Sequence, residues 1–228
     1  MMLGISDEKI RIAIIDDNYD ARRLASIEVR DAGYDYFFPD SVPQEVSDMA
    51  YLIKQNASGA LCDHRLAFGS YASFQGAELV AFLYDIGFPA LLVTQYSEID
   101  ADVSIRKWRK KIPTLISREE MSAESIKIGF EKCLSELRGT KNTERIAHRT
   151  LLRVTGREYE SGEEVVDVVI PGWNPQKAVR FPLSLINSDI RDKVQLECRL
   201  FAHINIGAND SEDLFFENFE IAPELQDE

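Results

Sequence analysis

The chain has 228 residues, of which 45% are hydrophobic, and a formal net charge of −13. It is long enough for one large or two small domains with a real core, and its charge argues against nucleic acid or an anionic membrane as partner. Three scattered cysteines exclude a disulfide framework and favour reduced thiols in a cytoplasmic protein. We find no apolar run of membrane-spanning length, and residues 1–9 lack the hydrophobic region of a signal peptide.

The first half of the chain alternates between short apolar runs and amphipathic stretches. Buried strands are predicted over residues 12–15, 34–38, 60–63, 89–94 and 113–117. Helices are predicted over 20–32, from Ser41 onward, over 76–87, over 99–109, and along the stripe Ile126, Phe130, Cys133, Leu134 and Leu137. Five strands alternating with helices predict an α/β fold, a doubly wound parallel sheet with helices on both faces.

A polar stretch over residues 139–149 is predicted to be a linker, because the sequence pattern changes after it. Beyond it, apolar and polar residues alternate, most extensively over 194–206. Further strands are predicted over 151–155, 165–170, 178–183 and 214–221. We therefore predict a small, mainly antiparallel all-β domain over 150–222, either a barrel or a sandwich, followed by an acidic tail over 223–228.

Polar side chains stand where three of the predicted strands end. Asp16 and Asp17 follow the first strand, Asp63 ends the third, and Thr94 ends the fourth. The carboxyl ends of parallel strands meet at one edge of a sheet, so these residues are expected to lie together. Close carboxylates repel one another, and a hard cation such as Mg²⁺, which takes oxygen ligands, relieves that repulsion.

At this point residues 10–138 resemble the receiver domains of bacterial two-component response regulators. The resemblance rests on an ordered set of features: the two acids after strand one, Asp63 after strand three, Leu66, the Gly76–Leu79 stretch, and the strand that ends at Thr94. It implies the flavodoxin-like strand order 2-1-3-4-5. We recognise no family in the β domain.

The resemblance assigns roles to individual residues. Asp63 would be the phosphoacceptor and Thr94 the switch residue. Asp16 and Asp17, together with Asp63 and the backbone carbonyl of Arg65, would bind Mg²⁺.

Two features depart from the family pattern. The family has a lysine at the end of strand five, where this chain has Ser117 followed by Arg118, and the aromatic position two residues earlier is Leu115. An arginine can reach a phosphoryl group, although its planar fork does not replace a lysine directly. The loop over residues 67–75 is longer than usual and is expected to cover Asp63 or bind a partner.

Several features also have simpler interpretations. The polar residues at the strand ends can instead be helix caps, with Asp17 or Asn18 as the candidates for the helix that follows. A basic cluster surrounds Trp108 and consists of Arg106, Lys107, Arg109, Lys110 and Lys111. It is either a solvated helix face or part of the fourth-helix and fifth-strand face, through which the resemblance implies docking or a homodimer. His64 is either an incidental loop residue or a group that tunes phosphoryl hydrolysis. Trp173 is either a partner anchor or a structural lid.

The leading hypothesis is a cytoplasmic response-regulator-like protein, phosphorylated on Asp63 by a histidine kinase or phosphotransfer protein with Mg²⁺, whose β domain binds an output protein. The alternative is a receiver-like adaptor that binds proteins without phosphorylation. An enzyme with its active site in the β domain is a third class, disfavoured because no catalytic motif is recognised. Residues 145–228 hold 9 Lys and Arg against 16 Asp and Glu, which makes DNA binding unlikely.

Overall fold

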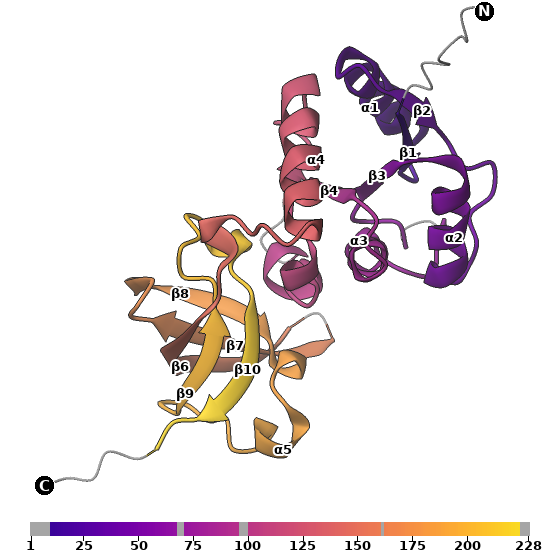
Figure 1. Cartoon of the computed structure of the whole chain (residues 1–228). Helices are drawn as coiled ribbons and strands as arrows, with labels where there is room; N and C mark the ends of the chain where they lie inside the picture. Colours follow the sequence, from indigo (N-terminus) through magenta and orange to yellow (C-terminus); the bar gives the residue numbers. More distant parts are fainter. Residues whose placement is uncertain (1–9, 68–70, 96–99, 161, 224–228) are drawn as a thin grey trace, which may run out of the picture. The chain divides into compact units, whose positions relative to one another are not determined.

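The computed structural model describes residues 10–67, 71–95, 100–160 and 162–223 (Figure 1). The chain divides into two compact units. The first contains Met1–Tyr96 and Lys111–Thr140, and the second contains Ser97–Lys110 and Lys141–Glu228. Residues 1–9 and most of the predicted acidic tail lie outside the described residues. No helix in the described ranges is long and apolar enough to cross a membrane.

The first unit is built on a five-stranded parallel sheet in the order β2-β1-β3-β4-β5. The strands are β1 (Arg11–Ile15), β2 (Asp35–Phe37), β3 (Gly59–Asp63), β4 (Ala90–Thr94) and β5 (Leu115–Ser117). The three central strands are almost wholly buried, as their continuous apolar runs predict. The predicted α/β class and strand order are both confirmed.

Four α-helices belong to this unit: α1 (Tyr19–Asp31), α2 (Val46–Asn56), α3 (Gly76–Asp85) and α4 (Ala123–Leu137). Successive strand residues face opposite sides of a sheet. Accordingly, Ile12 and Ile14 of β1 share one core cluster with residues of α1 and α4. Helices α2 and α3 contact each other, so the helices form two pairs.

Helix α2 begins later than predicted. The sequence suggested a start at Ser41, but the helix begins at Val46 with Glu45 as its N-cap. Pro43 disfavours helical backbone at the residue before it, Val42, which explains why the helix does not extend to Ser41.

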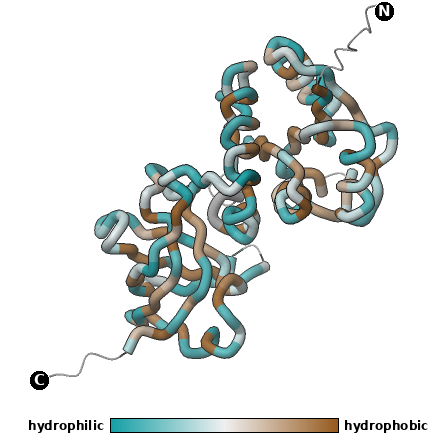
Figure 2. Tube along the Cα trace, in the orientation of Figure 1, coloured by the Kyte–Doolittle hydropathy of each residue, from teal (hydrophilic) through white to brown (hydrophobic). Residues whose placement is uncertain are grey.

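The second unit contains a five-stranded antiparallel sheet in the order β10-β9-β6-β7-β8. Its strands are β6 (His148–Glu160), β7 (Glu163–Ile170), β8 (Asn174–Pro182), β9 (Arg199–Ile204) and β10 (Phe216–Ile221). Hydrophilic and hydrophobic residues follow one another along these strands (Figure 2), as expected for a sheet with one buried face. The predicted antiparallel β domain is therefore present.

The prediction of a long strand over 194–206 is wrong for its first residues, because β9 covers only Arg199–Ile204. Glu197 adopts a positive φ of 64°, which interrupts extended backbone. The chain turns there, with the Cys198 N–H donating to Gln195 O at 3.0 Å. Leu196 is consequently 64% exposed, although the alternation placed it on the buried face.

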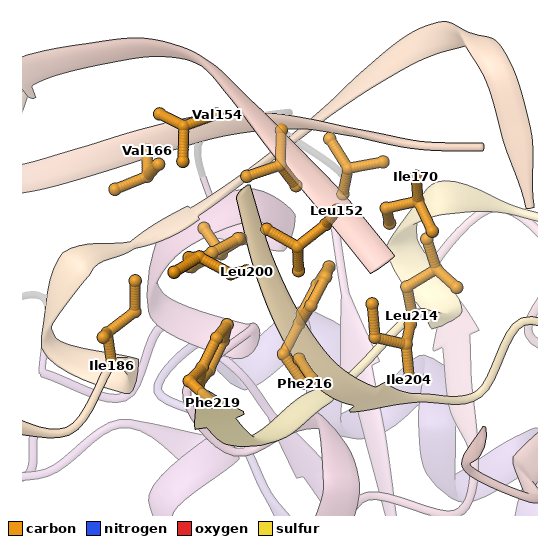
Figure 3. Packing of buried hydrophobic residues seen from close by; sticks show 14 of the residues in the cluster. Leu152, Val154, Val166, Ile170, Ile186, Leu200, Ile204, Leu214, Phe216 and Phe219 are labelled. Carbon is orange, nitrogen blue, oxygen red and sulfur yellow. The ribbon is translucent and has the colours of Figure 1, made fainter. Parts of the chain in front are cut away.

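The core of this unit lies on one face of the antiparallel sheet (Figure 3). Phe216 and Phe219 of β10 contact Phe181 of β8, with ring centroids 4.7 and 5.5 Å from it. The two edge strands therefore meet over the core, which shows that the sheet is strongly curled. Trp173 packs against this core and donates its indole N–H to Ala208 O at 2.8 Å, which fits the structural interpretation of this residue.

The stretch between β4 and β5 folds with the second unit. We call its described part, residues 100–110, the anchor segment. It contains η2 (Asp100–Ile105) and the first residues of η3 (Arg109–Lys111) in place of the regular helix predicted over 99–109. Because η2 contacts β8, the division differs from the continuous 10–138 domain predicted from the sequence.

Arg106 is a deeply buried charged residue of the anchor segment, with 1% of its surface exposed. Its guanidinium donates to Ser211 O and Leu214 O at 2.5 and 2.8 Å, and it lies 5.9 Å from the ring centroid of Phe216. The side chain thereby supplies donors to two backbone carbonyls of the connection that leads into β10.

Neighbouring side chains extend this attachment. Arg109, 3% exposed, donates to Glu212 O at 3.1 Å and pairs with Asp213 at 2.5 Å. Lys107 pairs with Glu163 at 2.6 Å, and Lys110 pairs with Glu217. These basic residues bind the chain's own second unit, so neither a solvated helix face nor a free dimerisation surface describes Arg106 and Arg109.

We expect Arg106→Ala to lower the free energy of unfolding of the second unit by about 3 kcal/mol, because Leu214 O loses its Arg106 donor and, among the described residues, Ser211 O keeps only the Leu214 N–H. Both tryptophans, Trp108 and Trp173, belong to this unit, so tryptophan fluorescence in a urea titration reports on it selectively.

The control for this prediction is Arg153→Ala, which removes an exposed pair with Glu197 and should change stability by no more than about 0.5 kcal/mol. Equal unfolding curves for the two variants would contradict the role given to Arg106.

Candidate functional site: an acidic pocket at the carboxyl edge of the parallel sheet

Asp16 and Asp63 are brought together by the register of the parallel sheet. Asp16 directly follows β1, Asp63 ends β3, and the pairing of Ile15 with Cys62 aligns the two strand ends. Both side chains are buried, at 6% and 7% exposure. Two of the predicted carboxylates therefore share one pocket.

Arg118 links these two carboxylates. One terminal nitrogen, Nη2, donates to Asp16 Oδ2 at 2.8 Å and also to Asp63 Oδ1. The Arg118 backbone N–H donates to Thr94 O at 2.9 Å, which holds the residue against the end of β4. Of the two candidates for the lysine position, Arg118 contacts Asp63, whereas the Ser117 hydroxyl accepts a hydrogen bond from Glu119 N at 3.3 Å.

The remaining carboxylate oxygens accept backbone hydrogen bonds. Asn18 N–H donates to Asp16 Oδ1 at 2.8 Å, and Arg65 N–H donates to Asp63 Oδ2 at 2.7 Å. Asn18 uses its own side chain to cap α1, where it accepts from Ala21 N at 3.1 Å. The helix-cap interpretation therefore applies to Asn18, while both buried acids are directed to Arg118.

The charges in the pocket influence one another. Burial raises the pKa of Asp16 above its ordinary value of 3.8, and the neighbouring Asp63 charge adds to this. The Asn18 N–H and Arg118 lower the pKa of Asp16 but do not offset the burial. Burial lowers the pKa of Arg118, whereas the two carboxylates raise it and prevail. The guanidinium is therefore the fixed charge of the site.

Thr94 lies where the resemblance places a switch hydroxyl. It ends β4, is 1% exposed, and pairs with Ser117 in the sheet. Its hydroxyl oxygen is buried and has no hydrogen-bond partner among the described residues. A buried hydroxyl without a partner is unfavourable and can bind an oxygen atom of an incoming group.

The predicted magnesium ligands are only partly assembled. Asp17 is exposed, and across the described ranges no three acidic, histidine or cysteine side chains form a cluster that could hold a metal ion. Arg118 already binds both buried carboxylates. As arranged, these residues do not fit Mg²⁺, and magnesium binding stays a prediction that requires Arg118 to move away.

The cavity beside these side chains is small. A space of about 10 Å³ is lined by Asp16, Asp63, Arg118 and apolar neighbours. This volume is near the minimum for a single water molecule. On its other side, Arg118 lines a larger groove of about 340 Å³ along Leu24 and Ile27 of α1.

Two further residues near the pocket, Arg22 and Tyr71, were not predicted from the sequence. The Arg22 guanidinium lies about 6 Å from the ring centroids of Tyr19, Phe38 and Tyr71. Burial raises the pKa of the Tyr71 phenol, Arg22 lowers it, and the charges of Asp16 and Asp17 raise it.

Tyr71 of the long loop is therefore influenced by the charges of Asp16 and Asp17, while cover of Asp63 by this loop and binding of a partner both stay predictions. No motif points to Arg22, because its aromatic neighbours come from three separate segments. His64 is 1% exposed, so it is a buried residue and does not lie in an open loop.

Helix α3 approaches β3 very closely at Gly76. A Cβ atom at this position would lie 1.7 Å from Asp63 O, which is too close for any real contact. We therefore expect Gly76→Ala to displace the end of β3. The free energy of unfolding should fall by about 3 kcal/mol or more. Far-UV circular dichroism during thermal unfolding measures this loss of stability. Gly172→Ala, whose Cβ would meet a Thr150 methyl group at 3.3 Å, should be milder, and a fully stable Gly76→Ala protein would refute the expectation.

The raised pKa of Asp16 makes stability depend on pH. Because the folded protein binds this proton more tightly than the unfolded chain, the contribution is complete below the ordinary value of 3.8 and is lost as pH rises through the folded-state pKa. Asp16→Asn should remove this loss, so its free energy of unfolding should exceed that of the wild type at neutral pH.

Urea unfolding, followed by circular dichroism between about pH 4 and pH 8, tests this effect of Asp16. The exposed Asp31→Asn serves as control and should follow the wild-type curve. Parallel curves for Asp16→Asn and the wild type would contradict the prediction.

Comparison with solved structures finds chains similar to somewhat more than half of this chain. A sensor protein from Polaromonas sp. JS666 is 13% identical, with a TM-score of 0.43, and the match covers 56% of this chain and 98% of that one. A response regulator receiver domain protein from Clostridium thermocellum is 11% identical, with a TM-score of 0.43 and coverages of 57% and 97%. A receiver domain protein from Methanospirillum hungatei JF-1 is 17% identical, with a TM-score of 0.41 and coverages of 57% and 97%.

No protein-family model matches the chain, and no curated protein matches its sequence. The solved structures found in this comparison include receiver domains of response regulators.

Proposed function

We propose that this chain is a receiver-type signalling protein in which Asp63 accepts a phosphoryl group from a histidine kinase or phosphotransfer protein. One observation carries the proposal: Asp63 ends the central strand beside a fixed guanidinium, and the neighbouring strand ends in Thr94, whose buried hydroxyl has no hydrogen-bond partner within the described residues. Together they offer a nucleophilic carboxylate, a cation and a hydrogen-bond donor.

The proposed transfer is a displacement at phosphorus. An oxygen of the ionised Asp63 carboxylate forms the new P–O bond, while the bond from phosphorus to the imidazole nitrogen of the donor breaks and its electron pair leaves with the imidazole. Arg118 would stabilise the negative charge on the phosphoryl oxygens, and the Thr94 hydroxyl would donate to one of them.

The second unit is the proposed output domain. Thr94 precedes the anchor segment along the chain, and Arg106 and Arg109 of that segment hold the connection before β10. A change at Thr94 would therefore reach the antiparallel sheet through covalent structure. In an acidic domain without a recognised catalytic motif, we expect the sheet to bind another protein.

A second candidate, a receiver-like adaptor that acts without phosphorylation, is favoured by a specific observation. Arg118 already satisfies Asp16 and Asp63, so the pocket is complete without an added group. In this case the fold would serve as a fixed binding module.

The deciding experiment is incubation of the full chain with acetyl phosphate, with and without Mg²⁺, followed by intact-mass measurement. The proposal expects one phosphoryl adduct that is absent in Asp63→Asn. A folded wild-type protein without any adduct would instead support the adaptor.

The same reaction also tests the relay to the second unit. In a Trp173→Phe background, Trp108 is the remaining tryptophan and lies within the anchor segment. Phosphorylation should change its emission, and Thr94→Ala should keep the adduct but lose that change. An unchanged emission in a phosphorylated protein would contradict the relay.

A further inference from the structure

We propose that Arg118 is a built-in counter-cation, which takes the place of a divalent metal ion between Asp16 and Asp63. The pocket would then be structurally complete without a metal, and metal binding would compete with Arg118. This inference concerns the resting pocket and does not depend on phosphorylation of Asp63.

The first support is that every oxygen of the two carboxylates already accepts a hydrogen bond from the chain. Two oxygens bind Arg118 Nη2, and the other two bind the backbone N–H groups of Asn18 and Arg65. A metal ion needs at least some of these oxygens as ligands. It would have to displace donors that are already in place.

The second support is the way in which Arg118 is held. Its backbone donates to Thr94 O, and its side chain is 28% exposed, compared with 9% and 7% for the side chains of Asp16 and Asp63. Its guanidinium reaches both acids through one nitrogen. Such charge-assisted hydrogen bonds at partly buried positions are stronger than those at the surface.

The third support comes from charge and space. A metal ion between the acids would face the guanidinium charge, which the two carboxylates themselves stabilise. The cavity of about 10 Å³ beside these groups has no room for the several water molecules that Mg²⁺ normally keeps. Both effects favour the internal cation over the metal.

The test is a calorimetric titration of Mg²⁺ into the full-length wild type, Arg118→Ala and Arg118→Gln at constant ionic strength. Removal of the guanidinium leaves two buried carboxylates without their shared cation. We expect both variants to bind Mg²⁺ at least about tenfold more tightly than the wild type. Mg²⁺ should also raise the thermal midpoint of the variants but not that of the wild type.

Matched controls separate this effect from a general loss of positive charge. Arg11→Ala removes an arginine that pairs with Asp35 on the exposed surface, at 3.7 Å, and should behave as the wild type does. In Arg118→Gln combined with Asp63→Asn, the gained affinity should be lost, because one carboxylate ligand is gone. Arg118→Gln retains hydrogen-bond donors, so it provides a readout if Arg118→Ala unfolds.

Wild-type Mg²⁺ binding as tight as that of Arg118→Gln would overturn the inference. So would a wild-type thermal midpoint that rises with Mg²⁺ as much as that of the variants. Failure of the acetyl phosphate reaction would count against the proposed phosphoacceptor function alone, because the metal titration requires no phosphoryl transfer.

Discussion

The arrangement of the strand ends in the first unit depends on two buried carboxylates that share one guanidinium. Asp16 and Asp63 lie at adjacent strand ends because β1 and β3 are parallel and in register. Burial of two like charges is costly unless a cation and hydrogen bonds compensate it. Arg118 supplies that compensation from the end of β5, so the three strand ends are coupled electrostatically. The chemistry of Asp63 therefore depends on where Arg118 lies.

A second group of buried arginines attaches the anchor segment to the second unit. Arg106 and Arg109 bind mainly backbone carbonyls of the second unit, and one acidic side chain, Asp213, joins them. Burial, together with the nearby Arg145 and Arg106, lowers the pKa of Arg109, while Asp213 raises it to a smaller extent. The anchor segment is thus built into the antiparallel unit, although it is inserted between two strands of the parallel sheet. Under the proposed function, this connection is the physical route from Thr94 to the output sheet.

The comparison of the two arginine groups shows why a basic residue is hard to interpret by position alone. The cluster around Trp108 has the composition of a solvated surface, yet two of its arginines are almost fully buried. Arg118, by contrast, stands one residue beyond the expected lysine position and still reaches Asp63. In both cases the deciding factor is the set of oxygen atoms that the fold presents. Those atoms come from segments far away in the sequence.

The sequence by itself determined the parallel sheet and the placing of Asp16 and Asp63 at its carboxyl edge, because continuous apolar runs that end in polar residues define buried parallel strands. The strand order came from the resemblance of residues 10–138 to receiver domains. The sequence also indicated the antiparallel unit through alternation. Only the tertiary structure decided that β9 begins at Arg199, because the turn at Glu197 is a backbone property that hydropathy does not encode. Likewise, the partners of Arg22, Arg106 and Arg118 follow from long-range packing. Local pattern indicates which apolar strand residues are buried, apart from exceptions such as Leu196, whereas the burial and pairing of charged residues depend on which distant strands and loops fold against them.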